Sequence, residues 1–341
     1  MIILTKFLGL HPTLPLAELE AVFQAEKIDY WLIETFENYA VHGVKKFKPK
    51  KLGERLALTH AIFEILSDIT SADAEQLVEK AKIKGIRLPY TVKIEKIGKG
   101  MDIDYQRFLK EVADEVWRKL EKDGIKPSVD LNNPATEFWV FVGEDFVILT
   151  RKLVEVDKKQ FTERAPPNRP FFLPISMDPR IARAIVNLTR IKRGKKFLDP
   201  CCGSGGLLLE AASIGCRVYG VDIDEKMVEG SVRNLKHYGF YGSVKKGDCR
   251  KLEKIFNKRN YFDGIATDFP YGRSTRKQNA KMYEECLKSM ERVLKPLSYM
   301  VIVAHEEIRP KSKNLILVEL HRQRVHRNLV RYIHVFRKMK K

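Results

Sequence analysis

The chain has 341 residues, with 63 lysines and arginines against 44 aspartates and glutamates, so its formal net charge is +19 at pH 7. This excess of positive charge indicates a polyanionic partner, most often nucleic acid, because the charge-rich surface of a thermophile would explain abundant charge but not the imbalance. A hydrophobic content of 44% excludes wholesale disorder, and no apolar run approaches the roughly 18 residues that span a bilayer.

The first half of the chain predicts two small α+β domains. In residues 1–54 we expect a helix whose apolar residues recur on one face, and three strands: the helix over 14–25 and the strands over 1–8, 28–34 and 39–44. In residues 55–153 the apolar pattern predicts a strand, a helix and a hairpin: the strand over 88–97, the helix over 105–120, and the hairpin from 137–142 and 146–152.

The second half predicts a different architecture. Four prolines between 166 and 174 exclude a continuous helix or a central strand, so residues 154–174 are interpreted as a linker. Beyond it, strands and helices alternate: strands over 196–199, 217–221, 264–267 and 299–304, and helices over 178–190, 207–214, 225–237 and 279–294. This rhythm predicts a doubly wound parallel sheet, and the strands 314–325 and 329–336 predict an antiparallel hairpin that closes one edge.

Four acids follow consecutive strands of this sheet. Asp199 precedes a glycine-rich turn, and Asp222, Asp248 and Asp268 lie at or near the ends of the next three strands, around the crevice where such sheets bind ligands. One such acid is more often a helix cap, but four beside a glycine-rich turn favour a ligand site. An acid at the turn would repel the pyrophosphate of a dinucleotide. It suits the cationic S-adenosylmethionine, whose ribose Asp222 can hold.

The motifs resemble a known family. The order D-P-x-C-G-S-G-G, V-D-I-D, G-D and D-F-P-Y resembles Rossmann-fold methyltransferases of exocyclic amines, whose motif is [DNS]-P-P-[YF]; Phe269 departs from its second position. Upstream, 129–134 and the following hairpin resemble the end of a THUMP domain, and 169–177 resembles the linker of THUMP methyltransferases. Nearly the whole chain is thus similar to the archaeal THUMP-containing tRNA guanine-N2 methyltransferases that modify position 10.

This resemblance implies the domain organisation and the partners. It implies an α/β fold with a ferredoxin-like N-terminal domain over 1–54, a THUMP RNA-binding domain over 55–153, the linker over 154–174 and a Rossmann-fold methyltransferase domain over 175–341. It also implies S-adenosylmethionine as cofactor and tRNA as partner, with the THUMP domain holding the tRNA 3′ end. We further expect a monomer that is not bound to a membrane.

The resemblance also assigns site residues. The expected catalytic residues are Asp268, which accepts an N–H of the guanine amine, Pro270, whose backbone carbonyl or that of Phe269 accepts the other, and Tyr271, on which the flipped base stacks. The residues expected to line the cofactor site are Ser176, Met177, Asp199, Cys201, Gly203, Gly205, Asp222, Ile223, Asp248, Cys249 and Asp268. Two alternatives stay open: Ile223 as a core residue at a strand end, and Ser176 and Met177 as a plain helix N-cap.

Basic residues are the expected RNA contacts. They are Lys93, Lys96 and Lys99 on or after a THUMP strand, Arg151 and Lys152 at the end of the hairpin, and Arg273, Arg276 and Lys277 after the D-F-P-Y motif. Each alone is more often a solvated charge than a contact, and only the cluster 273–277 gains from its position beside the expected base.

Parts of the sequence are also compatible with other functions. The same chemistry could act at tRNA position 6 or on ribosomal RNA, and a THUMP protein could bind RNA without catalysis, although its four acids would then be unneeded. A THUMP thiouridine synthase would need an ATP-binding loop and a reactive cysteine pair, and a DNA adenine methyltransferase would lack the THUMP half. Neither description fits this sequence.

Cysteines and the N-terminus bear on the compartment. The five cysteines are an odd number without a Cys-x-x-Cys pair, so we expect reduced thiols, no disulfide framework and no metal site. The N-terminus has neither the basic region nor the small-residue cleavage site of a secretory signal. Both features predict a cytoplasmic protein.

Overall fold

A computed structural model describes residues 1–174, 176–269, 276–326 and 329–340, of which 276–280, 325–326 and 329 are described for the backbone alone. The chain forms two compact units. The first comprises residues 1–7, 29–53 and 59–156, and the second comprises 8–28, 54–58 and 157–341.

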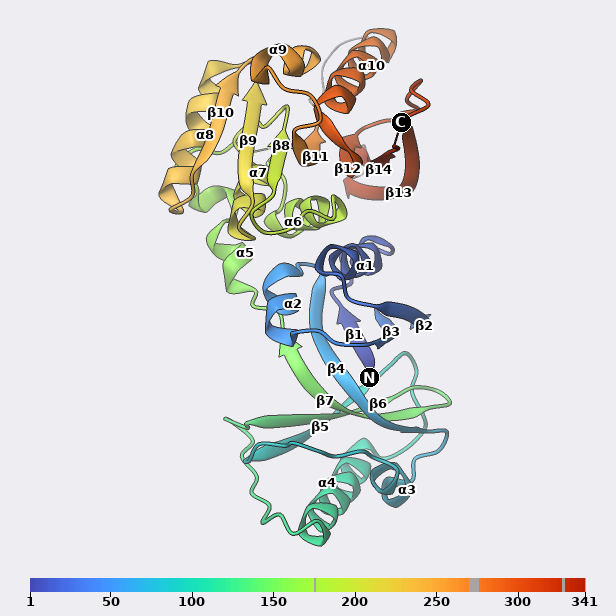
Figure 1. Cartoon of the computed structure of the whole chain (residues 1–341). Coiled ribbons are helices and arrows are strands. Elements are labelled where there is room, and N and C mark those ends of the chain that lie inside the picture. Colours follow the sequence, from blue (N-terminus) through green and yellow to red (C-terminus); the bar gives the residue numbers. More distant parts are fainter. Residues whose placement is uncertain (175, 270–275, 327–328, 341) are drawn as a thin grey trace. The chain divides into compact units, whose positions relative to one another are not determined.

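The first unit is built on a seven-stranded sheet of order β2-β3-β1-β4-β7-β6-β5 (Figure 1). Its strands are β1 (Ile2–Phe7), β2 (Tyr30–Phe36), β3 (Tyr39–Val44), β4 (Thr59–Ile69), β5 (Tyr90–Lys96), β6 (Thr136–Val142) and β7 (Val147–Glu155). Its helices are α3 (Ala74–Glu79) and α4 (Tyr105–Lys122), and α2 (Pro49–Arg55) begins in it. This sheet contains strands from both sides of residue 54, the predicted domain boundary. The boundary and the THUMP assignment both stay predictions.

Helix α4 shows why the sequence pattern works in this unit. Its buried residues Phe108, Val112, Val116 and Leu120 are spaced by four, so they form one apolar face. This face packs with Phe138 and other side chains of the sheet in one core cluster. Asp104 starts the helix by accepting the backbone N–H groups of residues 106 and 107. The predicted helix and hairpin are both confirmed.

The second unit contains the other seven-stranded sheet, of order β10-β9-β8-β11-β12-β14-β13 (Figure 1). Its strands are β8 (Lys196–Asp199), β9 (Arg217–Asp222), β10 (Gly242–Lys246), β11 (Phe262–Asp268), β12 (Leu294–Ala304), β13 (Leu315–His326) and β14 (Leu329–Lys338). The first five in this order are parallel, and β14 pairs antiparallel with both β12 and β13. The predicted parallel sheet with an antiparallel hairpin at its edge is confirmed.

Two core clusters line this second sheet. One joins buried residues of α1 (Leu14–Glu26), α6 (Pro179–Leu188) and α7 (Gly206–Ser213) with the strands, together with Leu235 of α8 (Glu225–His237). The other joins α9 (Leu252–Phe256) and α10 (Arg276–Val293) with alternate residues of the same strands. Because neighbouring strand residues point to opposite faces, the two clusters mark the two sides of a doubly covered sheet.

Helix α1 belongs to the second unit, although the sequence groups it with the N-terminal strands. Its buried Glu18 accepts backbone N–H groups of Ala57 and Leu58 at 3.0 and 2.8 Å, and the side-chain amide of Asn187 on α6 at 2.8 Å. Burial raises the pKa of Glu18, and these hydrogen bonds partly offset the effect. Residues 8–28 are therefore part of the core around α6.

The proline-rich segment carries only two short helices, α5 (Lys159–Glu163) and the 3₁₀ helix η1 (Pro166–Asn168). A second 3₁₀ helix, η2 (Cys249–Lys251), lies between β10 and α9. Within the described ranges, no helix combines the length and the apolar character needed to cross a membrane.

Candidate methyl-transfer site

The four predicted acids lie at one edge of the second sheet. Asp199 ends β8, Asp222 ends β9, Asp248 follows β10 and Asp268 ends β11. Because these four strands are parallel neighbours, their carboxyl ends meet at the same edge. The sequence placed all four acids correctly at strand ends, whereas their roles in binding stay proposals.

Asp199 is the most deeply buried of these acids, with 2% of its surface exposed. Its Oδ1 accepts the Thr267 hydroxyl at 2.7 Å and the Cys201 backbone N–H at 3.2 Å. Burial, with the negative charges of Asp222 and Asp268 adding to it, raises the pKa of Asp199 to about 7. Burial, with the negative charges of Asp199 and Asp222 adding to it, also raises the pKa of the Cys201 thiol, so Cys201 is a neutral thiol beside Asp199.

Asp222 holds the glycine-rich turn. Its Oδ2 accepts the Gly203 backbone N–H at 2.8 Å, and its Oδ1 accepts the Asp224 N–H at 3.0 Å. Gly205 is the N-cap of α7 and has a φ of +81°, and a Cβ there would lie 2.5 Å from Oγ of Ser231. Glycine is therefore required at this position. Each Asp222 oxygen accepts one N–H and keeps a lone-pair direction for a ligand hydroxyl.

The structure excludes both alternatives that the sequence left open, for Ile223 and for the segment before α6. Ile223 is 70% exposed beside Asp222, so it is not a core residue. The α6 N-cap is Asp178, whose Oδ1 accepts the Arg180 N–H at 2.8 Å, so neither Ser176 nor Met177 is the cap. The Ser176 hydroxyl lies 3.4 Å from that of Ser204 in the glycine-rich turn, while the Met177 side chain is buried in the core.

One positioning residue of this turn escaped the sequence analysis. Asn234 of α8 donates to the carbonyls of Phe171 and Ser204 at 2.6 and 2.9 Å, and its Oδ1 accepts the Phe171 N–H at 2.9 Å. It therefore joins the segment before α6 to the glycine-rich turn. The only signal in the sequence is a polar residue on the buried side of a predicted helix, a feature that Ser231 shares and that is too common to single out Asn234.

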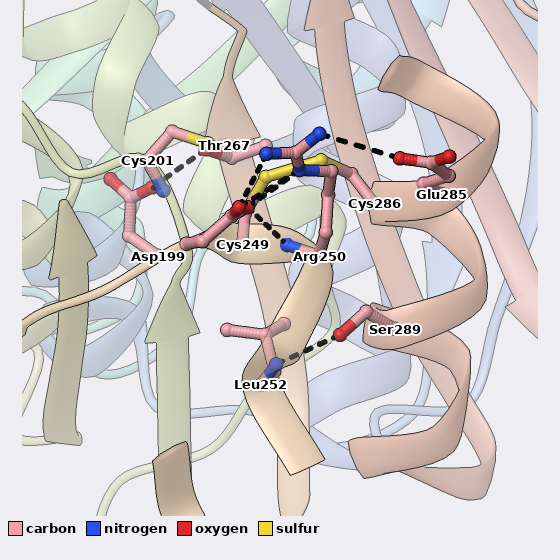
Figure 2. Close-up of a disulfide and its surroundings, with 10 residues drawn as sticks. Asp199, Cys201, Cys249, Arg250, Leu252, Thr267, Glu285, Cys286 and Ser289 are labelled. Carbon is pink, nitrogen blue, oxygen red and sulfur yellow. Dashed lines mark hydrogen bonds and ion pairs between the residues drawn. A yellow bond between two sulfur atoms is a disulfide. The ribbon is translucent and has the colours of Figure 1, made fainter. Parts of the chain in front are cut away.

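Asp248 is already engaged by a neighbour. Its carboxylate accepts Nε of Arg250 at 2.9 Å and an Nη at 2.6 Å, and these hydrogen bonds lower the pKa of Asp248. Arg250 also lies 3.5 Å from a carboxylate oxygen of Glu285 on α10 (Figure 2). An adenine amine at Asp248 would share the carboxylate with Arg250.

A disulfide corrects the expectation of reduced thiols. Cys249 and Cys286 are 37 residues apart in sequence, but their Cα atoms are 5.5 Å apart and their sulfur atoms are bonded (Figure 2). That Cα distance is typical of disulfides, and the absence of a short motif cannot exclude a pair that the fold brings together. Cys201, Cys202 and Cys216 are free. The bond attaches the segment after Asp248 to α10. A hydrogen bond joins the same two parts, since the Ser289 hydroxyl of α10 accepts the Leu252 N–H at 2.9 Å (Figure 2).

The end of β11 carries the expected target-binding residues. Asp268 is 24% exposed and lies 3.7 Å from the Arg331 guanidinium of β14. Phe269, which replaces a proline of the family motif, donates its backbone N–H to the Val303 carbonyl at 3.0 Å and stacks on Tyr283 of α10, with ring centroids 4.7 Å apart. Pro270, Tyr271 and Arg273 lie outside the described residues. Arg276 and Lys277 are in α10, with only their backbone described.

The predicted RNA contacts of the first unit fall into two groups. Lys93 and Lys152 both form ion pairs with Glu137, and Arg151 forms one with Glu64. A phosphate would have to compete with these carboxylates. Lys96 and Lys99 are exposed and remain the stronger candidates, while all five assignments stay predictions. Within the described part of the chain, no group of three or more metal-ligating side chains is found.

This combination of sheet order, glycine-rich first turn and acids at the strand ends defines a Rossmann-like methyltransferase domain. Residues 166–333 match the family model of the RMKL-like methyltransferase domain, UPF0020. The fold is similar to that of TrmN from Thermus thermophilus, with a TM-score of 0.55, 20% identity, and coverage of 99% of this chain and 100% of the other.

Relatives define the family more narrowly. The chain is 36% identical to the tRNA (guanine(10)-N2)-dimethyltransferase of Methanothermobacter thermautotrophicus, covering 96% of this chain and 97% of that protein. It is 30% identical to the enzyme of the same name from Methanocaldococcus jannaschii, covering 97% and 98%. The chain belongs to the tRNA (guanine(10)-N2)-dimethyltransferase family.

Proposed function

We propose that this protein transfers methyl groups from S-adenosylmethionine to the exocyclic N2 amine of guanosine 10 in tRNA, forming N2-methylguanosine and then N2,N2-dimethylguanosine. The observation that carries the proposal is the alignment, over nearly the full length, with relatives named for this reaction. The acids at one edge of the sheet supply the negative charge and the hydrogen-bond acceptors that such a reaction needs. Since both relatives are named for position 10, they favour this site over position 6 or ribosomal RNA.

The site fits S-adenosylmethionine better than a phosphate-containing cofactor. Asp222 and Asp268 are close enough to Asp199 for their charges to raise its pKa. This excess of negative charge attracts the sulfonium and ammonium groups of S-adenosylmethionine and repels a pyrophosphate. When bound, this cofactor supplies a methyl group on a positively charged sulfur atom.

Each lining residue has a proposed part in binding. Asp199 and the turn at Gly203 and Gly205 face the methionine end, and the backbone at Ser176 and Met177 binds its carboxylate. Asp222 accepts the ribose hydroxyls, because each of its oxygens keeps a free lone-pair direction. The exposed Ile223 covers the adenine ring, and the segment at Asp248 and Cys249 binds the adenine edge. Cys201 lines the pocket as a neutral thiol.

Asp268 makes the guanine amine reactive. The lone pair of this amine is delocalised into the ring, so the amine is a poor nucleophile until acceptors hold its hydrogen atoms. The Asp268 carboxylate accepts one N–H and takes the proton that nitrogen loses as the N–CH₃ bond forms, a contribution of about 10²–10⁴-fold for a positioned acid–base group. The carbonyl of Phe269 or Pro270 accepts the other N–H, and Tyr271 stacks on the flipped base.

Binding of tRNA depends on the basic surface and on residues 55–153, to which we assign the THUMP function of holding the 3′ end. Lys93, Lys96, Lys99, Arg151 and Lys152 are the candidates in this segment, and Arg273, Arg276 and Lys277 are the candidates beside the flipped base. In this arrangement the target is chosen by its distance from the 3′ end more than by the surrounding sequence. We also propose that the active species is a single chain in the cytoplasm.

Methyl transfer to three tRNA transcripts tests the proposal. We expect labelled methyl groups in a transcript with guanine at position 10, and no transfer when adenine replaces that guanine or when the 3′ single-stranded end is removed. Methylation that persists after the substitution and lies at position 6 would show that the target is position 6 instead. Tight tRNA binding without transfer would instead support a protein that only binds RNA. Binding should weaken with salt, with a log–log slope of about −0.7 to −0.9 per phosphate contacted.

A further inference from the structure

We propose that Arg331 is a positioning residue that holds the Asp268 carboxylate in its charged, amine-accepting orientation; this inference rests on the proposed methyl transfer. The family motifs that run from the glycine-rich turn to the end of β11 do not include Arg331, which lies more than 60 residues beyond Asp268 on the last strand.

The sheet topology brings Arg331 to the target end of the site. Strand β14 runs antiparallel to β12, so its first residues lie at the carboxyl end of β12. Asp268 pairs with Val303 of β12, and Val303 pairs with Ile333 of β14. These three residues therefore share one face of the sheet, and Arg331, two residues before Ile333, shares it as well. The arginine reaches past the end of β12 toward Asp268.

The contact is a partly buried ion pair. One Nη of Arg331 lies 3.7 Å from Oδ2 of Asp268, and the two side chains are 8% and 24% exposed. A guanidinium buried to this extent is costly unless it faces an acid. Asp268 in turn lies among other acidic and ionisable groups, since its charge raises the pKa of both Asp199 and Tyr283, and Glu306 acts on Tyr283 as well. Arg331 is a cation held against this acidic edge.

This ion pair affects how Asp268 accepts an N–H of the guanine amine. A carboxylate crowded by other acids is repelled by them and favours rotation away from them, which would remove the acceptor that the guanine N–H needs. Arg331 opposes this rotation. Loss of its charge should therefore slow methyl transfer while S-adenosylmethionine and tRNA bind as before, because Arg331 acts through Asp268.

A double-mutant cycle tests this role. Single-turnover rates are measured with tRNA and excess enzyme for the wild type, R331M, D268N and the double variant, with S-adenosylmethionine affinity measured by calorimetry. We expect R331M to lower the rate about 10- to 100-fold, the cost typical of a misplaced catalytic group, with an unchanged dissociation constant. R331K should restore part of the rate, and R331M should cost nothing further in the D268N background.

The matched control is R337M. Arg337 lies six residues along the same strand, on the same face, and pairs with Tyr299 in the middle of β12, four residues before Val303, so its loss should leave the rate within about twofold of wild type. If R331M melts at a lower temperature than the wild type, R331Q takes its place in the cycle.

The outcomes separate this role from the proposed function. A wild-type chain that transfers no methyl group to tRNA overturns the proposed function and with it the role of Arg331. A wild-type chain that transfers normally, with R331M equally fast, overturns the role of Arg331 alone. Independent, multiplicative losses from R331M and D268N would also contradict it, because Arg331 would then not act through Asp268.

Discussion

Replacing Asp222 by alanine tests where the cofactor binds. In the structure Asp222 accepts backbone N–H groups of Gly203 and Asp224, and each oxygen keeps a direction for one ribose hydroxyl. A hydrogen bond to a charged acceptor is worth about 1.5–3 kcal/mol, and about 1.4 kcal/mol is a factor of ten. Loss of even one such bond should raise the S-adenosylmethionine dissociation constant at least tenfold.

Calorimetry with a matched control makes this test specific. Asp224, two residues further on, caps α8 by accepting the Lys226 N–H at 2.9 Å. D224A should therefore lose about 1 kcal/mol of stability but bind S-adenosylmethionine like the wild type. An unchanged dissociation constant in D222A, or equal weakening in both variants, would refute the placement of the ribose at Asp222.

Three further predictions concern the reacting group, the pH dependence and the disulfide. Asp268→Asn should slow methyl transfer by about 10²-fold or more in a single-turnover assay while the calorimetric affinity for S-adenosylmethionine changes little; near-normal turnover would remove Asp268 from the mechanism. The pKa of Asp199 is raised from 3.8 to about 7, so the free site binds a proton below pH 7 that a cationic cofactor must displace. Cofactor affinity measured by calorimetry should therefore rise with pH up to about 7 and then level off. Without ligand, the folded chain holds this proton more tightly than the unfolded chain, so the free energy of unfolding should fall as the pH rises from 3.8 to about 7. Thiol titration of the unfolded, unreduced chain should find three free cysteines, and five after reduction, because Cys249 and Cys286 are paired; five before reduction would contradict the disulfide.

The sequence predicted those parts of the fold that repeat a simple period. Helix α4 has an uninterrupted apolar stripe, and strands β8 and β11 of the second sheet are short, largely buried runs that end in an acid. Strand β4 was not recognised, because its pairings with β1 and β7 shift register at three places, and two of these shifts insert an extra residue into β4 itself and so interrupt its alternation. Helix α1 was recognised, but its packing on α6 could not be predicted, since it depends on contacts far away in the sequence.

In the site too, features set by a local pattern could be predicted, and features set by contacts between distant segments could not. Acids at strand ends can be read from the chain because the carboxyl ends of parallel strands meet at one edge of the sheet, whatever the order of the strands. Arg331, Asn234 and the Cys249–Cys286 bond depend on pairings between distant segments, and no local pattern marks them. The exposure of Ile223 also required the structure, since an isoleucine after a strand is equally common in a core.

Mass-spectrometric mapping of a tRNA fragment tests the central claim most directly. The tRNA is incubated with S-adenosylmethionine and either wild-type or D268N protein, digested, and analysed for the fragment that contains position 10. We predict N2-methylguanosine and N2,N2-dimethylguanosine at position 10 with the wild type and, over the same short incubation, mostly unmodified guanosine with D268N. Unmodified guanosine at position 10 after wild-type treatment, or equal methylation by both proteins, would contradict the account.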